Sequence, residues 1–192
     1  MTDHWCSING ASKTLEDTEK GLRDILPHMH TPENAPGEKS HRVVYAVHEL
    51  FTSSSTAEET TPSRFIGFVA LRSLNSSMLD LPSSFFPPQS PPYLVVELSY
   101  QLLSSSWSHG FATESLSAVF DACRVTKDFW SPWERVYVRA IVNAPNAASL
   151  RVVEKAGLRE VGVYVWEGEK VWMAGRWTGR EELRIWGAWL LG

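Results

Sequence analysis

The stretch Tyr93–Arg124 reads YLVVELSYQLLSSSWSHGFATESLSAVFDACR. It contains three consecutive segments that differ in composition and in the spacing of their apolar residues. Tyr93–Leu103 is rich in apolar and β-branched residues, which predicts a strand. Ser104–Phe111 is rich in serine and contains a glycine, which predicts a loop. Ala112–Arg124 carries apolar residues at helical spacing, which predicts a helix. A strand, a small-residue loop and a helix in this order can hold a phosphate group, because the first N–H groups of a helix lack partners and the helix dipole attracts anions.

The glycine of this loop, Gly110, would let the backbone approach a ligand closely, because glycine has no Cβ. The same residue could simply end a loop, so this feature alone leaves both interpretations open. The loop is not a Walker loop, since the required Gly-Lys-Ser/Thr is missing. It is not the dinucleotide-binding fingerprint either, because that motif needs several glycines.

Composition predicts one ordinary domain, 1–192. The chain has 192 residues, of which 43% are hydrophobic, so a sizeable core can form. The net charge of -4 and the absence of a basic run argue against a nucleic-acid partner. No apolar run approaches the ~20 residues of a membrane span, so we expect no membrane partner. Two distant cysteines, Cys6 and Cys123, and a polar N-terminal region favour a cytoplasmic protein, with a nuclear location as the alternative.

Before this stretch, the sequence predicts a helix and a hairpin. Ser12–Pro27 has an apolar side at helical spacing and ends at a proline. Arg42–Phe51 and Arg64–Leu74 have the composition of strands and are joined by the polar turn region Thr52–Pro62, so they predict a long-looped hairpin.

Three histidines near this hairpin, His28, His30 and His41, could be interpreted as metal ligands. No cysteine or carboxylate at a supporting spacing accompanies them, and the segment His28–Ser40 has the composition of a loop. We therefore expect no metal site.

The segment Asn75–Pro92 is rich in proline and serine and has Phe85 and Phe86 in its middle. Proline lacks an N–H donor, so this segment cannot form a core strand or helix. We expect residues 82–92 to form a loose loop insertion on the surface, with an ordered flap over a site as the alternative.

After the stretch, Glu134–Val142 alternates apolar residues and predicts a strand. Ala147–Ala156 predicts a short helix, for which Asn146 is a suitable N-cap and Gly157 a suitable residue just beyond the C-terminus.

The last segments predict a second hairpin. Val161–Glu167 and Lys170–Trp177 have strand composition and flank a turn signal at Gly168-Glu169. Arg180–Gly192 is apolar and fits a strand or a helix. Hairpins mixed with strand–helix–strand units predict an α/β fold with a mixed sheet flanked by helices.

Two motifs at a suitable separation resemble the GNAT acetyltransferases. Trp107-Ser-His-Gly110-Phe-Ala112-Thr-Glu114 resembles the acetyl-CoA pyrophosphate loop of the RimJ/RimL-like branch, commonly Trp-Gly-Lys-Gly-Tyr-Ala-Thr-Glu-Ala. Asn146-Ala-Ala-Ser149-Leu-Arg-Val-Val-Glu-Lys155-Ala-Gly157-Leu resembles the second signature of that branch, Asn-x-x-Ser followed by Glu-Lys-x-Gly-Phe. Glu97-Leu-Ser-Tyr100 also matches the usual Glu-Ile-Gly-Tyr of the fourth strand. The resemblance covers roughly residues 12 to 177.

The resemblance implies the GNAT fold, with a central, mostly antiparallel sheet of about six to seven strands. In this family, parallel strands 4 and 5 diverge, and the pantetheine arm of acetyl-CoA lies in the gap. Here these strands would be Tyr93–Leu103 and Glu134–Val142. The thioester carbonyl would lie near the amides of Leu98, Ser99 and Tyr100, where a main-chain donor can stabilise an oxyanion by ~3 kcal/mol.

The same resemblance implies which residues contact the co-substrate, acetyl-CoA. Those expected at its diphosphate are Trp107, Ser108, His109, Gly110, Phe111, Ala112 and Thr113. Asn146 and Ser149 are expected near its pantetheine arm. Ser108 replaces a usual glycine and His109 a usual Lys or Arg, so we expect main-chain amides to provide most of the diphosphate binding. A histidine carries full charge only below about its ordinary pKa of ~6.5.

The first strand and helix of the family have no counterpart in this sequence. An exposed sheet edge should follow, protected by the C-terminal segment or by a partner subunit, so a homodimer is one expectation.

For catalysis, many family members use a tyrosine four residues before the glycine that ends the second helix, and this position is Val153. The resemblance instead assigns the proton donor to Ser149, which could also be an ordinary residue of a first helical turn. Glu97 is the first candidate for the base, because its strand is otherwise apolar and can partly bury the carboxylate, and Glu167 is the alternative. Either carboxylate could be purely structural.

The resemblance predicts an acetyl-CoA-dependent N-acetyltransferase that acts on a primary amine of a protein N-terminus or a small molecule. The alternative is a non-catalytic acyl-CoA-binding or protein-interaction domain of GNAT fold. A third interpretation is a degenerate fold that no longer binds CoA.

Overall fold

The computed structural model describes residues 40–51, 62–74, 78–173 and 176–192, together with Thr14, Glu16 and Glu19. For residues 169–173 and 176–178 only the backbone is described. The predicted helix Ser12–Pro27, the loop from His28 up to residue 39 and the turn region 52–61 therefore lie outside the described residues, apart from those three positions.

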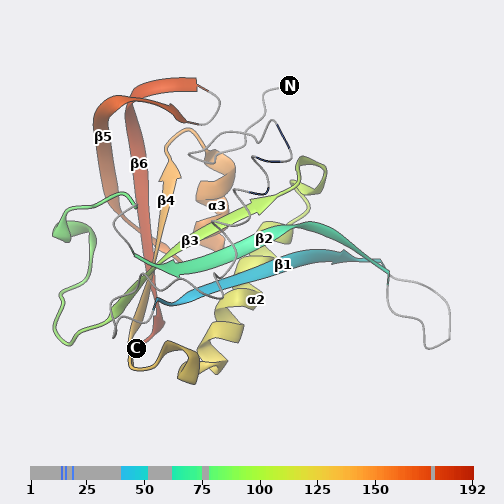
Figure 1. The fold of residues 1–192 in the computed structure, drawn as a ribbon, viewed down its shortest axis with the longest axis horizontal. Helices are drawn as coiled ribbons and strands as arrows, with labels where there is room; N and C mark the ends of the chain where they lie inside the picture. The colour runs from blue at the N-terminus through green and yellow to red at the C-terminus, as the bar shows by residue number, and fades with distance from the viewer. Residues whose placement is uncertain are drawn as a thin grey trace.

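One six-stranded sheet with the strand order β1-β2-β3-β4-β6-β5 forms the centre of the molecule (Figure 1). The strands are β1 Arg42–Leu50, β2 Ser63–Ser73, β3 Leu94–Leu102, β4 Val136–Asn143, β5 Arg159–Met173 and β6 Arg176–Leu191. The helices are α2 Phe111–Val125 and α3 Ala147–Lys155. Among the described strands, only β3 and β4 pair in parallel, and α2 connects them. This confirms the predicted mixed α/β fold.

The hairpin and the crossover unit lie where the sequence predicts them. β1 and β2 pair antiparallel from Arg42↔Arg72 to Leu50↔Ser63. The bounds of β3, α2, β4 and α3 differ by only one or two residues from the predicted ranges. Because these segments carry clear two-residue or helical periodicity, the buried face of each follows directly from the sequence.

The predicted second hairpin is wrong. β5 continues through Gly168-Glu169, and it pairs with β6 both before the glycine, at Glu167↔Arg180, and after it, at Val171↔Thr178. The register shifts between these two pairs, so the glycine marks an irregularity within one strand. A Cβ at Gly168 would lie 2.6 Å from the indole of Trp166, so this glycine makes room for a ring. Arg180–Gly192, ambiguous in the sequence, belongs to β6.

The main core lies between the sheet and the two helices. α2 contributes Leu116, Val119, Phe120 and Cys123 to a core cluster that includes residues of β2, β3, β4 and β6, and α3 contributes Val153. Complete burial of each large apolar side chain stabilises the fold by about 1.5–3 kcal/mol. Both helices therefore cover the same face of the sheet.

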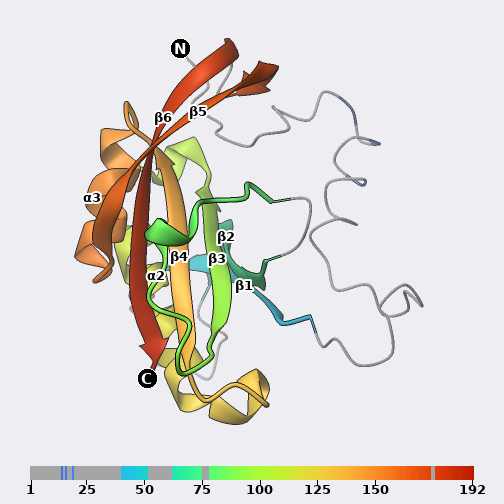
Figure 2. The ribbon, with the colours of Figure 1, turned by 90° about the vertical axis from the view of Figure 1, so that its left-hand side faces the viewer.

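A second apolar cluster lies on the opposite face of the sheet. Leu81 packs against Leu183 and Ile185 of β6, and Phe85 and Phe86 pack against the same cluster. In Figure 2, the proline-rich segment crosses this face of the sheet, away from the helices. The expectation of a loose surface insertion at residues 82–92 is therefore wrong for its first part, because Phe85 and Phe86 pack onto the sheet.

The two edges of the described sheet are β1 and β5. The C-terminal segment does not protect the edge at β1, contrary to one of our expectations, because β6 lies inside the sheet between β4 and β5. The central position of β6 agrees with its many large apolar residues. The buried ones are Leu183, Ile185, Trp186, Leu190 and Leu191.

Candidate active site

The parallel strands β3 and β4 separate halfway along their length. They pair only from Leu94↔Val136 to Glu97↔Arg139. Beyond this point β3 continues to Leu102 and β4 to Asn143, and their arrows point apart in Figure 1. The main-chain groups of the edge of β3 that faced β4 are thus free of strand pairing from Leu98 onward. This is the geometry that a linear amide-containing ligand can complete as an added strand.

Each of the two strands stays paired with its outer neighbour beyond the point where they separate. β3 remains paired with β2 as far as Gly67↔Leu102, and β4 remains paired with β6 as far as Asn143↔Leu183. Gly67 has a φ of 154°, and a Cβ there would lie 2.0 Å from the carbonyl oxygen of Gln101. Glycine at this position therefore allows β2 to hold the end of β3 closely.

The N-terminus of α2 lies directly after the divergent part of β3. Gly110 is the N-cap residue, has a φ of 88° and provides no side-chain cap. A Cβ at Gly110 would have no other atom within 4 Å, so the space beside this helix end is open. The first N–H groups of the helix, those of Phe111, Ala112 and Thr113, have no partner within the helix. This arrangement fits an anionic group such as a diphosphate.

Two contacts fix the loop before α2. The indole N–H of Trp107 donates to the carbonyl oxygen of Leu102 at 2.9 Å, which ties the loop to the end of β3. The ring of His109 stacks on that of Phe111 with a centroid distance of 5.7 Å. Ser108 has a φ of 64°, a left-handed conformation that costs a residue with a side chain about 1–2 kcal/mol. This explains why glycine suits this position.

Asn146 is the N-cap residue of α3, as predicted. The Asn146 Oδ1 accepts a hydrogen bond from the backbone N–H of Ser149 at 3.1 Å, which confirms Asn146 as the N-cap. Gly157, just beyond the helix, has a φ of 91°, as expected for a residue in this position. Ser149 is thereby held in the first turn of α3.

Tyr100 connects the divergent part of β3 with this helix start. Its hydroxyl oxygen is buried and makes no hydrogen bond of ordinary geometry, although it lies close enough to Ser149 for the two side chains to interact. Burial raises the pKa of Tyr100, and the interaction with Ser149 lowers it by a smaller amount. From the sequence, only the main chain of Tyr100 was expected at the site. Two-residue periodicity could have shown that its side chain shares the helix-covered face with Val96 and Leu98.

Glu97 lies on the opposite face of β3. Its Oε2 accepts hydrogen bonds from Nη2 and Nε of Arg139, at 2.8 and 3.0 Å, and its Oε1 lies 3.8 Å from Nη2 of Arg72. The side chain of Arg139 is only 2% exposed and also donates to the carbonyl oxygen of Leu79 at 3.0 Å. Glu97 therefore neutralises a buried cation, and its role as a base stays a prediction.

Glu167, the alternative carboxylate, lies on β5, which is separated from β4 by β6. Its side chain is 67% exposed and forms an ion pair with Arg180, with 3.1 Å between Oε1 and Nε. Its role in the site also stays a prediction.

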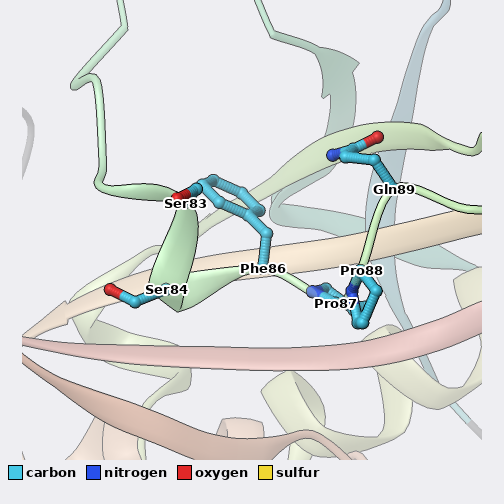
Figure 3. A pocket seen from close by; sticks show the side chains of 6 residues that line it. All are labelled: Ser83, Ser84, Phe86, Pro87, Pro88 and Gln89. Atoms are coloured by element: carbon cyan, nitrogen blue, oxygen red, sulfur yellow. The ribbon is translucent and has the colours of Figure 1, made fainter.

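Two shallow cavities lie along the proline-rich segment. One has a volume of about 410 Å³ and is lined by Leu74, Met78, Leu79, Asp80, Phe86, Gln89, Val95 and Arg139. The other, of about 420 Å³, is lined by Ser83, Ser84, Phe86, Pro87, Pro88 and Gln89 (Figure 3). The lining of the first contains Val95 and Arg139, at the paired part of β3 and β4, so this cavity adjoins the point where the strands diverge.

Within the described ranges, no group of three or more histidine, cysteine or acidic side chains is arranged to hold a metal ion. His41 is buried and its ring lies 6.0 Å from that of Trp130 and 5.8 Å from that of Phe129, so it belongs to the core. His28 and His30 lie outside the described residues. The described helices include none with the length and apolar character needed to cross a membrane.

Comparisons with known proteins agree with this geometry. The family model described as "Acetyltransferase (GNAT) domain" matches residues 2–159. Spermidine N-acetyltransferase from Vibrio cholerae, solved with CoA and spermine, superposes with a TM-score of 0.56 at 14% identity, over 96% of this chain and 80% of that one. No curated protein sequence matches.

Other solved structures match a smaller part of the fold. Ribosomal-protein-S5-alanine acetyltransferase from Vibrio fischeri has a TM-score of 0.43 at 15% identity, over 65% of this chain and 54% of that one. Phosphinothricin acetyltransferase from Sinorhizobium meliloti has a TM-score of 0.44 at 18% identity, over 67% of this chain and 55% of that one. Because the family model spans most of the sequence and the sheet diverges where the motifs require it, this chain belongs to the GNAT acetyltransferase family.

Proposed function

We propose that this protein is an acetyl-CoA-dependent N-acetyltransferase that transfers an acetyl group to a primary amine. The observation that supports this proposal most directly is the divergence of β3 and β4 after Glu97↔Arg139, beside the open N-terminus of α2. The Vibrio cholerae structure of the same fold contains CoA together with spermine, a polyamine. This fold therefore binds CoA and an amine together in that protein.

In the proposed complex, acetyl-CoA lies on the helix-covered side of the gap. The amides of Phe111, Ala112 and Thr113 bind its diphosphate, with Trp107, Ser108, His109 and Gly110 shaping the loop. The edge of β3 at Leu98–Tyr100 binds the pantetheine amides, and Asn146 and Ser149 lie near the arm. A main-chain N–H of β3 stabilises the oxyanion that develops on the thioester carbonyl, an effect worth ~3 kcal/mol.

The amine acceptor approaches from the opposite face of the sheet. This face carries the cavity of about 410 Å³, with the exposed carboxylate of Asp80 and the amide of Gln89 in its lining. A carboxylate attracts a protonated amine before the reaction.

The amine must lose a proton before it attacks the thioester. Glu97 is our first candidate for this step, acting through a water molecule at Oε1, the oxygen that is less closely bound to arginine. Glu167 remains the alternative. Glu97→Gln is expected to reduce kcat at least about tenfold with little change in acetyl-CoA affinity. If Glu97 is only structural, the loss of kcat will instead follow the fraction of protein that unfolds.

Three finer assignments complete the proposal. The two motifs favour the RimJ/RimL-like branch, whose acceptors include protein N-termini as well as small amines. The exposed edge strand β5, with Val161, Val163 and Val165 on one side, supports a homodimer. The free, buried thiol of Cys123 agrees with the reducing cytoplasm.

Calorimetry with acetyl-CoA, followed by a thiol-release assay over a panel of peptides and small amines, tests the proposed function. We expect binding, and CoA release that depends on one class of amine. Binding without thiol release on any amine would favour a non-catalytic acyl-CoA-binding domain. The absence of binding would indicate a fold that has lost the co-substrate.

A further inference from the structure

The Tyr100 hydroxyl is a buried polar group without an ordinary hydrogen bond in the described part of the molecule. Its ring packs against the main core, which fixes the direction of the side chain. Buried hydroxyl groups nearly always have a partner, because burial removes their contacts with water. Tyr100 also lies three positions beyond Glu97, the last residue of β3 that pairs with β4. A ligand in the gap between these strands is therefore a suitable partner for this hydroxyl.

Ser149 is the polar side chain that interacts with the Tyr100 hydroxyl. Its position is set by the Asn146 cap, which binds the Ser149 N–H at 3.1 Å. The Tyr100 phenol is protonated at neutral pH, since its ordinary pKa of 10.0 lies well above 7 and burial raises this pKa, while the contact with Ser149 lowers it by stabilising the phenolate. The pair can thus release a proton and then accommodate the charge that remains.

The position that usually carries the acidic tyrosine of this family holds Val153, which is completely buried in the main core. A valine cannot provide a proton. Ser149 alone would be a poor source, because an aliphatic hydroxyl is a far weaker acid than a phenol. Among the described residues that meet near the start of α3, Tyr100 has the chemistry that this step requires.

Building on the proposed function, we propose that the Tyr100 hydroxyl protonates the CoA thiolate as it departs, while Ser149 stabilises the phenolate. As the amine nitrogen forms the C–N bond, the C–S bond breaks and its electron pair moves to sulfur. The Tyr100 O–H bond then breaks as the S–H bond forms. The Ser149 hydroxyl donates to the resulting phenolate. An N–H bond of the amine breaks as the amide forms and its proton passes to solvent, and the phenolate takes one proton from solvent, so the step balances.

Binding measurements test the placement of Tyr100 without any need for an acceptor. Calorimetry is done with CoA and with desulfo-CoA, which lacks the sulfur. We expect the wild-type protein to bind CoA roughly three- to tenfold more tightly, the ratio that one hydrogen bond provides. Tyr100→Phe should remove this preference and leave desulfo-CoA binding unchanged. The matched control is Tyr164→Phe, whose ring packs with Phe85 on the other face of the sheet and which should keep the preference.

Kinetic measurements test the proton transfer itself. Tyr100→Phe should lower kcat by roughly 10²-fold without weakening acetyl-CoA binding, and Ser149→Ala by about tenfold. The double variant should be no slower than Tyr100→Phe, because both hydroxyls act in one step. Replacement of Tyr100 by a fluorinated tyrosine, a more acidic phenol, should move the alkaline fall of the rate to lower pH.

The outcomes separate this inference from the proposed function. Suppose that CoA binds more tightly than desulfo-CoA only when Tyr100 is present, and that no amine causes thiol release. This result would support the position of the Tyr100 hydroxyl beside the CoA sulfur and would contradict the proposed function. Thiol release with an unchanged kcat in Tyr100→Phe would overturn the inference and leave the function standing. An undiminished sulfur preference in Tyr100→Phe would also overturn it, and the absence of CoA binding would overturn both.

Discussion

At the scale of single residues, burial decides what each charged group contributes. The Glu97–Arg139 pair lies inside the molecule, with side chains 17% and 2% exposed, whereas the Glu160–Arg184 pair is 32% and 41% exposed. Both pairs have close contacts, 2.8 and 2.9 Å between N and O. A buried arginine that loses its carboxylate partner cannot be solvated by water in its place, whereas an exposed arginine can. Loss of the carboxylate should therefore cost more stability in the buried pair, although the N–O distances in the two pairs are similar.

This difference predicts that Glu97→Leu and Glu160→Leu affect stability unequally. Glu97→Leu leaves the buried guanidinium of Arg139 without a counter-ion and should lower the free energy of unfolding by about 3 kcal/mol. Glu160→Leu removes an exposed pair and should cost less than about 1 kcal/mol. Urea denaturation of the two variants measures both values. Equal losses would show that Glu97 is not needed to stabilise Arg139.

At the scale of elements, the two helix ends differ in function although their glycines are similar. Gly110 precedes α2 with a φ of 88°, and Gly157 follows α3 with a φ of 91°. At either glycine, a Cβ would have no neighbour within 4 Å. Replacing either glycine by a residue with a side chain should therefore strain the backbone to a similar extent. Of the two, only Gly110 lies at the proposed diphosphate site.

The variants Gly110→Ala and Gly157→Ala separate backbone strain from ligand contact. Each should lower the free energy of unfolding by about 1–2 kcal/mol, because a side chain is strained at positive φ. Gly110→Ala should also weaken acetyl-CoA binding about tenfold, since its Cβ occupies space beside the helix N–H groups. Calorimetry with both variants checks this prediction. Similar affinities in the two would place the diphosphate elsewhere.

The sequence predicts elements well where one periodicity dominates. β1 to β4, α2 and α3 follow from local alternation or helical spacing, and Asn146 and Gly157 follow from capping preferences. Gly168 misled the prediction because its small size accommodates the Trp166 ring and does not serve a turn. Phe85 and Phe86 misled it because the prolines around them hid two anchoring side chains.

The candidate site was harder to predict than the fold. Each of its two cofactor motifs lies within one short stretch of sequence, so Gly110 and Asn146 could be named as candidates from local patterns and the family resemblance. The pairs Glu97–Arg139 and Tyr100–Ser149 join residues on separate elements. Which side chains of separate elements meet depends on strand register and on the divergence of β3 and β4. A local sequence pattern does not contain this information.

At the scale of the whole molecule, the stability of the core depends on groups that stay neutral inside it. Cys123 is 1% exposed within α2, and burial raises the pKa of its thiol from 9.0 to about 11. In the unfolded chain the thiol ionises at lower pH than in the folded protein. The unfolded state therefore binds fewer protons than the folded state between these two values.

Because of this difference, the free energy of unfolding should fall as pH rises from about 9 to about 11. The stabilisation is complete below the lower value and is lost above the higher one. Cys123→Ala should be less stable at neutral pH, since it leaves a cavity, but should show a shallower decline over the same range. Urea denaturation at a series of alkaline pH values measures both slopes, and parallel slopes would contradict the prediction.

The central place of β6 in the sheet has a consequence for synthesis on the ribosome. β6 follows every other described strand in the chain, yet it joins β4 to β5. Until its residues leave the exit tunnel, β4 lacks one neighbour and β5 has no strand to pair with. A nascent chain that pauses before Arg176 thus presents apolar, unpaired strands, which are the surfaces that chaperones bind and that cause nascent polypeptides to associate.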